Sequence, residues 1–188
     1  MMRIITGRAR GIRLATLEGD ETRPTTERVK EAIFSMLQFD IEGRVVLDLF
    51  SGCGQLALEA LSRGASRAVM IDRSKDAIKI IRTNAQKTKL EGLCEIYNCE
   101  YMDYISKNKG KKFDLVFIDP PYALELSSKA IRGLCEADML KPTSIIVCET
   151  GGEDAFLGET DLALKFDVIK HTRYSKSYIT IITPKKDI

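Results

Sequence analysis

Residues 113–122 read FDLVFIDPPY, and this stretch decides the fold that the sequence predicts. The apolar run from Leu115 to Ile118 ends at Asp119-Pro120-Pro121-Tyr122, which indicates a short buried strand that stops in a rigid turn. Ligands bind at the carboxyl ends of strands in open parallel sheets, and two prolines stiffen the backbone there. The motif therefore predicts a site that holds a planar, amine-bearing ring. An ordinary surface turn after a strand explains the same residues.

Outward from this stretch, short apolar runs alternate with amphipathic helical patterns. Strands are predicted at residues 45–50, 68–71, 94–97, 115–118 and 144–148, and helices at 55–63, 75–88, 101–107 and 125–138. Such alternation is typical of an α/β fold with a parallel, doubly wound sheet. Residues 166–170 and 177–183 are separated by a turn and not by a helix, so an antiparallel hairpin is expected to close one edge of the sheet.

The first 40 residues have a different, basic character. Apolar residues alternate with arginines around Gly7 and Gly11, which predicts a β-hairpin. Four arginines precede the first acid, Glu18, and they are Arg3, Arg8, Arg10 and Arg13. Their unbalanced charge favours a phosphate-contacting arm, and the alternative is a solvated edge hairpin.

A helix is expected to follow the hairpin over residues 25–37. Thr25 or Thr26 can cap it, and its apolar face consists of Val29, Ile33, Phe34 and Leu37. We expect the chain to divide near residues 39–43, into a basic appendage at 1–40 and a sheet domain at 41–188.

Length and composition limit the class of protein. The 188 residues suffice for one sizeable core, and a net charge of +2 excludes a polycation without excluding nucleic acid as a partner. The sequence shows no signal peptide and no apolar run of bilayer length, so a soluble cytoplasmic protein without a membrane partner is expected. The five cysteines form no CxxC pair, which argues against a disulfide framework or a zinc site.

A second motif, VVLDLFSGCG at residues 45–54, places Asp48 near a strand end and before a glycine loop that opens a helix. Glycines let a ligand approach the backbone closely, and a helix N-terminus offers unpaired N–H groups. Gly52, Gly54 and Ala57 also fit a loose GxGxxA dinucleotide pattern. A nicotinamide-dependent oxidoreductase is therefore an alternative.

The acids at the strand ends favour a different cofactor. Asp48 would not stabilise a neighbouring pyrophosphate, whereas it would stabilise a cationic ligand amine. Asp72, after the second strand, lies where an acid accepts hydrogen bonds from ribose hydroxyls. Hydride transfer gives the Asp119–Tyr122 turn no role, so S-adenosylmethionine is the predicted cofactor. Glu100, with Cys99 or Tyr101 beside it, is a candidate for the adenine contact, although a solvated acid at a strand end is an equally simple explanation.

With these residues assembled, the chain resembles the RsmD family of bacterial small-subunit ribosomal RNA guanine-N2 methyltransferases from end to end. The resemblance rests on RIITGRARGIRL, TRPTTERVKEAIFSML, LDLFSGCGQLALEALSRGA, the strand ending in Asp72, FDLVFIDPPY and YSKSYITII. The glycine loop and DPPY occur in many amino-methylating enzymes. The basic hairpin followed by Arg23-Pro24-Thr25 is more specific to this family.

The resemblance implies a Rossmann-like fold that uses S-adenosylmethionine to methylate the exocyclic N2 of one guanine in 16S rRNA. The implied cofactor-binding residues are Asp48, Phe50, Ser51, Gly52, Gly54, Asp72, Arg73 and Glu100. The implied catalytic residues are Asp119, Pro120, Pro121 and Tyr122. The chain departs from the family pattern at Cys53 and Gln55, where small residues are usual, and at Glu100-Tyr101, which replaces Asp-Ala.

A guanine N2 amine is a weak nucleophile, so the predicted mechanism is one of positioning. The Asp119 carboxylate and, as the resemblance implies, the Pro120 carbonyl accept the amine hydrogens, while Tyr122 stacks on a base flipped out of the RNA. In-line transfer needs no metal and no strong base. The expected partner is 16S rRNA within a 30S subunit or an assembly intermediate, bound by a monomer. The expected RNA-binding residues are Arg3, Arg8, Arg10, Arg13, Arg23 and Arg28.

Two other functions stay open from the residues alone. DPPY suits any exocyclic amine, so an amino-methyltransferase acting on adenine or cytosine in DNA is the first. The second is a non-catalytic RNA-binding protein on the same scaffold. His171, the lone histidine, is interpreted as a surface residue or RNA-side contact and not as a catalyst.

Overall fold

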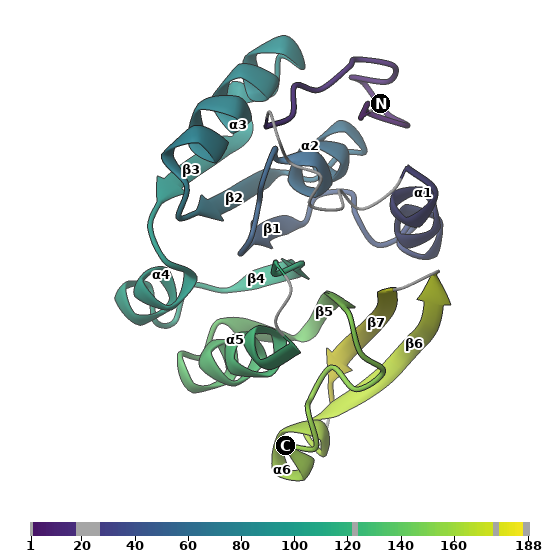
Figure 1. The fold of residues 1–188 in the computed structure, drawn as a ribbon, viewed down its shortest axis with the longest axis vertical. Helices are drawn as coiled ribbons and strands as arrows, with labels where there is room; N and C mark the ends of the chain where they lie inside the picture. Colours follow the sequence, from purple (N-terminus) through teal and green to yellow (C-terminus); the bar gives the residue numbers. More distant parts are fainter. Residues whose placement is uncertain (1, 18–26, 122–123, 175–176, 186–188) are drawn as a thin grey trace.

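A computed structural model describes residues 2–17, 27–121, 124–174 and 177–185. Its ribbon shows a central sheet with helices on both faces (Figure 1). The strands are β1 (Val45–Asp48), β2 (Arg67–Asp72), β3 (Cys94–Asn98), β4 (Phe113–Ile118), β5 (Leu140–Thr150), β6 (Phe166–Tyr174) and β7 (Ser177–Pro184). The helices are α1 (Glu27–Met36), α2 (Gln55–Ser62), α3 (Lys75–Lys87), α4 (Tyr101–Lys107), α5 (Leu124–Glu136) and α6 (Thr160–Ala163), with a 3₁₀ turn η1 (Glu91–Leu93).

The seven strands form one sheet in the order β3-β2-β1-β4-β5-β7-β6. The first five pair in parallel, while β7 pairs antiparallel with both β5 and β6. The predicted α/β fold, with its doubly wound sheet and antiparallel C-terminal hairpin, is confirmed. The chain winds from β1 to β3 in one direction and then crosses to β4 on the other side of β1, so a topological switch point lies between β1 and β4.

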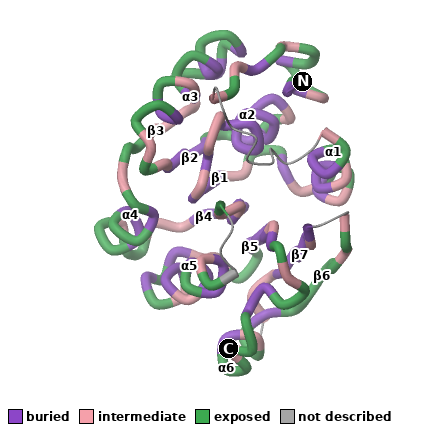
Figure 2. The backbone as a smooth tube through the Cα atoms, viewed as in Figure 1, coloured by how far each residue is buried: buried purple, intermediate pink, exposed green. Residues whose placement is uncertain are grey.

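Side chains alternate along each strand and fill two core clusters, one on each face of the sheet. The first lies under α1, α2 and α3 and includes Phe34 and Phe117, whose ring centroids are 5.9 Å apart. The second lies under α4, α5 and α6 and includes Phe113 and Ile146. Figure 2 shows the buried central strands and the exposed outer faces of the helices. The spacing prediction for α1 is confirmed because Val29, Ile33, Phe34 and Leu37 are all buried.

The N-terminal segment folds back on itself but does not form two full strands. Arg3 and Arg13 make one antiparallel bridge, supported by amide hydrogen bonds from Ile4 to Ile12 and from Leu14 to Met2. The backbone of the turn bonds to α2 instead of extending the ladder. Met2, Ile4, Ala9 and Leu14 belong to the same core cluster as α2 and α3. The proposed caps of α1, Thr25 and Thr26, lie outside the described residues.

Within the part of the chain that the structure describes, no helix is both long enough and apolar enough to cross a bilayer. The five cysteines are free thiols, and Cys148 is the one that is fully buried.

Candidate functional site

Three acids meet at the carboxyl edge of the parallel strands. Asp48 and Asp72 are the last residues of β1 and β2, and Asp119 follows the end of β4. Asp48 lies opposite Phe117 in the register of β1 and β4, so Asp119 is two residues beyond it along the neighbouring strand. The three acids therefore flank the topological switch point, the place where open α/β sheets bind ligands.

The loop after β1 is fixed by Ser51, which ties β1 to β2. The Ser51 hydroxyl donates to the Asp48 carbonyl at 3.0 Å and accepts from the Ile71 amide at 3.0 Å, while the Ser51 amide donates to the Ile71 carbonyl at 2.9 Å. Gly54 then takes a left-handed conformation, with φ of 81°, and starts α2. Glycine adopts this conformation without the steric penalty that a side chain brings, which explains its place in the loop.

Asp72 receives two backbone amides, one on each carboxylate oxygen. The Gly52 amide donates to one oxygen at 2.9 Å and the Ser74 amide donates to the other at 2.8 Å. Asp72 thereby holds the glycine loop against the start of α3. A carboxylate has about four acceptor positions in all, so hydrogen bonds from backbone amides and from a ligand hydroxyl are compatible at Asp72.

Asp48 is buried, with 1% of its surface exposed. Burial is the main reason that its pKa rises from 3.8 to about 7, and the nearby Asp72 charge adds to the rise. Amide hydrogen bonds from Phe50 and Ala57 and a side-chain bond from Ser51 oppose it only in part. Its Oδ1 atom has no hydrogen-bond partner among the described residues. A buried carboxylate oxygen without a partner is costly, so a cationic ligand amine fits this position.

The glycine loop also leaves room for a ligand. Gly52 has φ of 53°, and a Cβ placed there would meet no described atom within 4 Å. The open side of Gly52 and the unpartnered oxygen of Asp48 fit a ligand that carries an amine close to the backbone. Together with Asp72 as a hydroxyl acceptor, these groups suit a nucleoside that bears an amino acid chain.

The outer part of the site is more open. Phe50 and Tyr101 pack together with ring centroids 4.9 Å apart, which joins the end of β1 to the start of α4. Glu100 precedes α4, makes no capping hydrogen bond through its side chain, and lies 3.7 Å from Arg73 in an ion pair in which both side chains are more than half exposed. Such a pair is weak and can rearrange around a bound ring.

The loop after β4 is half-buried at Asp119 and Pro120 and exposed at Pro121. We call it the acceptor loop, after the role predicted for it. Ile118 is buried beneath it. Asp119 therefore directly follows a strand of which all residues except Asp114 are buried. Tyr122, the last of the predicted catalytic residues, lies outside the described residues.

The predicted RNA-binding arginines of the N-terminal segment are all exposed: Arg3, Arg8, Arg10 and Arg13. Two of them also make contacts within the protein. Arg3 pairs with Glu27 of α1 at 2.6 Å, and the Arg8 guanidinium donates to the Leu61 carbonyl at 3.2 Å. Arg28 is exposed at the start of α1, and Arg23 lies outside the described residues.

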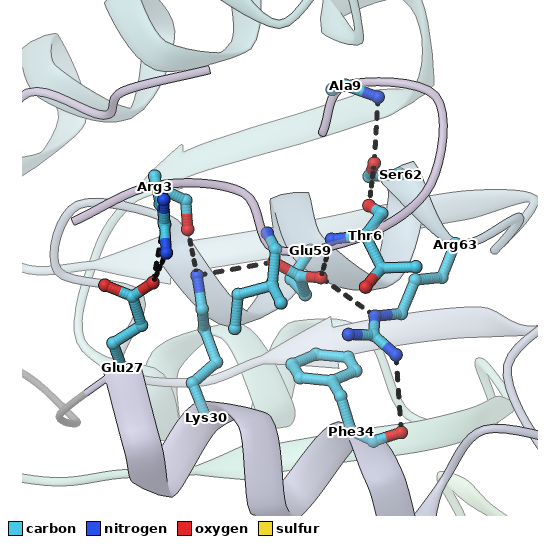
Figure 3. Close-up of polar contacts among 10 residues, drawn as sticks. Arg3, Thr6, Ala9, Glu27, Lys30, Phe34, Glu59, Ser62 and Arg63 are labelled. Carbon is cyan, nitrogen blue, oxygen red and sulfur yellow. Dashed lines mark hydrogen bonds and ion pairs between the residues drawn. The ribbon is translucent and has the colours of Figure 1, made fainter. Parts of the chain in front are cut away.

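The sequence did not predict the polar network that holds residues 2–17, which we call the arm, against α2 (Figure 3). Glu59 is fully buried in the middle of α2, and its carboxylate accepts from the Ile5 amide at 2.7 Å and the Thr6 amide at 3.0 Å. Lys30 of α1 lies 3.3 Å and Arg63 lies 2.8 Å from the same carboxylate. The available signal was a single acid inside the otherwise apolar run LALEAL.

Further bonds complete the anchor. Lys30 also donates to the Arg3 carbonyl at 2.5 Å, and burial lowers the pKa of Lys30 although the Glu59 charge opposes the change. The Ser62 hydroxyl donates to the Thr6 carbonyl at 2.6 Å and accepts from the Ala9 amide at 3.0 Å. The backbone of the arm is therefore fixed while its arginine side chains face outward.

Asn84 of α3 connects the arm to the glycine loop. It is fully buried, accepts from the Ala15 amide at 2.8 Å, and donates to the Ala15 carbonyl at 2.9 Å and to the Cys53 carbonyl at 2.8 Å. One side chain thus bonds both to the end of the arm and to the loop that carries Gly52. Among the described residues, no group of three or more histidines, cysteines and acids is arranged to hold a metal ion.

The known proteins that resemble this chain in sequence include named methyltransferases. The family model described as "Conserved hypothetical protein 95" matches residues 2–183. The chain is 37% identical to the ribosomal RNA small subunit methyltransferase D of Haemophilus influenzae, over 79% of this chain and 78% of that protein. It is 33% identical to the methyltransferase of the same name from Escherichia coli K12, over 81% of this chain and 76% of that protein.

A solved structure of a putative methyltransferase from Escherichia coli superimposes with a TM-score of 0.86 at 29% identity, covering 98% of each chain. The match therefore includes the N-terminal arm as well as the sheet. The chain belongs to the conserved hypothetical protein 95 family, the RsmD family that contains the small-subunit ribosomal RNA methyltransferases D.

Proposed function

We propose that this protein methylates the exocyclic N2 of a guanine in 16S rRNA with S-adenosylmethionine as methyl donor. The observation that carries the proposal is the buried Asp48, whose Oδ1 has no partner among the described residues, at an edge that also presents Asp119. Membership of the RsmD family supplies the substrate class, because the named relatives are small-subunit rRNA methyltransferases.

The glycine loop and the two strand-end acids would hold the cofactor. Asp48 would bind its amine, Asp72 its ribose hydroxyls, and the open side of Gly52 would let it lie against the backbone. Phe50, Ser51 and Gly54 shape this loop, and Arg73 and Glu100 border it where the adenine would lie. When bound, S-adenosylmethionine supplies an electrophilic methyl group on a sulfonium.

The acceptor loop would orient the guanine amine. The Asp119 carboxylate and the Pro120 carbonyl accept its two hydrogens, which directs the nitrogen lone pair towards the methyl group. Pro121 stiffens the loop, and Tyr122 stacks on the base. The amine proton becomes acidic only as the nitrogen gains positive charge, so Asp119 or water can remove it late in the reaction.

Residues 1–40 would dock the RNA and residues 41–188 would carry out transfer. The arm presents Arg3, Arg8, Arg10 and Arg13 from a backbone that Glu59 fixes, and Arg28 is exposed at the start of α1. Arg23 is proposed as a further RNA contact from the sequence alone. A backbone that is already fixed loses less conformational entropy when its arginines bind phosphate than a disordered segment would. We propose a monomer that acts in the cytoplasm on a 30S subunit or an assembly intermediate, without a metal.

Radiolabelled methyl transfer tests the proposal. The purified protein is incubated with labelled S-adenosylmethionine and with 30S particles, naked 16S rRNA or DNA, and the products are digested to nucleosides. Labelled N2-methylguanosine from rRNA is the expected product. Labelled N6-methyladenosine from DNA would contradict the proposal, and so would the absence of label in every acceptor.

Asp119→Ala separates acceptor binding from cofactor binding. The variant is expected to bind S-adenosylhomocysteine as the wild type does, and to lose transfer by about a hundredfold or more because one acceptor of the amine hydrogens is gone. Asp167→Ala is the matched control, since Asp167 is exposed near the start of β6. Normal methylation by Asp119→Ala would refute the assignment of the acceptor loop.

A further inference from the structure

The hairpin of β6 and β7 brings a second set of side chains to the edge that carries the acceptor loop. β7 runs antiparallel to β5, so its first residues lie beside the carboxyl end of β5, with Tyr178 opposite Thr150. Ile118 of β4 lies opposite Cys148 of β5, two residues before Thr150. Pro120 follows Ile118 by the same two residues, so Tyr178 lies at the same edge of the sheet as the acceptor loop, with β5 between them.

Three side chains form a contiguous row at this end of the hairpin. His171 lies opposite Thr180, and Arg173 lies opposite Tyr178. The His171 ring stacks on the Tyr178 ring with centroids 5.5 Å apart and an interplanar angle of 14°, and the Arg173 guanidinium carbon lies 5.6 Å from the Tyr178 centroid. We call these three residues, His171, Arg173 and Tyr178, the hairpin platform.

The platform faces the α5 side of the sheet and is open to solvent. Residues alternate between faces along a strand, and Ile182, which shares a face with Tyr178, belongs to the core cluster under α5 and α6. His171 and Arg173 are exposed, and Tyr178 is half-buried beneath them. A hydrogen bond of 3.0 Å between His171 Nδ1 and Thr180 Oγ1 holds the imidazole in its stacked position.

Planar groups ordered in this way are suited to a nucleic acid base. Bases stack on aromatic rings and on guanidinium planes, and the platform presents both kinds of group at its exposed surface. The charge has the matching sign, because Arg173 is exposed and carries a positive charge on the same face as His171 and Tyr178. The surface is therefore complementary to a single-stranded RNA segment with its phosphates.

We propose that the hairpin platform binds an unpaired nucleotide that flanks the target guanine, on the side of the acceptor loop opposite the N-terminal arm. The proposal rests on the proposed function, because an rRNA substrate provides that nucleotide. With the arm and α1 on one face of the sheet and the platform on the other, the RNA is held on both sides of the base that enters the site. The platform thus selects a loop over a continuous duplex.

The double variant His171→Ala/Arg173→Ala tests the proposal by direct binding and by methyl transfer. Its control is Lys107→Ala/Lys109→Ala, which removes two exposed lysines at the end of α4 and in the loop that follows it. Binding is measured to transcribed 16S rRNA and to a blunt RNA duplex, each over a range of salt concentrations. Thermal unfolding and S-adenosylhomocysteine affinity verify that the variants are folded.

The double variant is expected to bind 16S rRNA about tenfold more weakly than the control variant, to show a salt slope smaller by about one, and to keep its S-adenosylhomocysteine affinity. Duplex binding is expected to fall by about twofold at most, because a duplex offers no unstacked base. Arg173→Lys, which keeps the charge and loses the planar group, is expected to show most of the loss on 16S rRNA and provides a milder variant if the double variant unfolds.

Two results would overturn the proposal: 16S rRNA affinity equal to that of the control, or an equal loss for the duplex, which would indicate a general charge effect. Binding is measured independently of transfer, so the outcomes stay separable. A wild-type protein that binds rRNA through the platform but transfers no methyl group would contradict the proposed function and leave the platform supported.

Discussion

Replacing Asp48 with Asn is expected to make the protein more stable and to weaken cofactor binding at the same time. In the folded protein the pKa of Asp48 is raised from 3.8 to about 7, chiefly by burial. At about 1.4 kcal/mol per pKa unit, the ionised carboxylate destabilises the fold by about 4 kcal/mol at pH 8. Asn has nearly the same shape and no charge to desolvate, so it removes much of this cost.

The pH dependence follows from the same shift. Because the folded pKa is raised, the fold binds an extra proton between pH 3.8 and about 7, and its stability falls as pH rises through that window. Between pH 5 and pH 8, Asp48 alone is expected to lower the free energy of unfolding of the wild type by about 3 kcal/mol. Asp48→Asn lacks this contribution, so its melting temperature at pH 8 is expected to exceed that of the wild type by roughly 5–15 °C.

Cofactor binding is expected to change in the opposite direction. A ligand ammonium stabilises the ionised carboxylate, so wild-type affinity for S-adenosylhomocysteine rises with pH and levels off above about 7. Asp48→Asn is expected to lose about a hundredfold in affinity at pH 8. Thermal unfolding and calorimetric titration at pH 5 and pH 8 measure both effects, with the exposed Asp76→Asn as control. A less stable Asp48→Asn protein, or one with wild-type affinity, would refute the reasoning.

The remaining predictions concern the polar contacts that hold the arm against α2. Glu59→Gln leaves Lys30 buried without its counter-charge, so the free energy of unfolding in denaturant is expected to fall by about 3–5 kcal/mol. The double variant Glu59→Gln/Lys30→Met should regain part of this stability. A fall of less than about 1 kcal/mol for Glu59→Gln would show that the buried pair is unimportant. Gly7→Ala places a Cβ 1.9 Å from the Ser62 carbonyl oxygen, so it should weaken rRNA binding while cofactor affinity is kept. Gly11→Ala has a similar φ of 84° with open space around it and should be milder; equal effects of the two variants would contradict this account.

Much of the fold was predictable because apolar residues recur with a different spacing in strands and in helices. The alternation of apolar runs and helical patterns between residues 45 and 148 predicted the parallel strands within a few residues. The lack of a helical pattern between residues 170 and 177 predicted the terminal hairpin. Hydrophobic periodicity reports which residues are buried and does not report which strands are neighbours. The position of β7 between β5 and β6 was therefore not predicted.

The candidate site was predictable where an acidic residue stands at the end of a predicted strand, as Asp48, Asp72 and Asp119 do. The structure brings these acids to one edge, while their roles towards a ligand stay predictions. Glu59 and Asn84 could not be found in the same way, because each also bonds to backbone groups of the arm that are more than fifty residues away in the sequence. A backbone carbonyl or amide carries no signature in the sequence, so contacts of this kind are visible only after folding.

The insertion of β7 has a consequence for the order in which the sheet can be completed during synthesis. β6 leaves the ribosome before β7, yet β6 pairs with the sheet only through β7. Until Ser177–Pro184 has emerged, β5 is an open edge and β6 has no neighbouring strand to pair with. The sheet beside the acceptor loop is therefore completed last, and a nascent chain that lacks these residues exposes an edge strand of the kind that promotes aggregation.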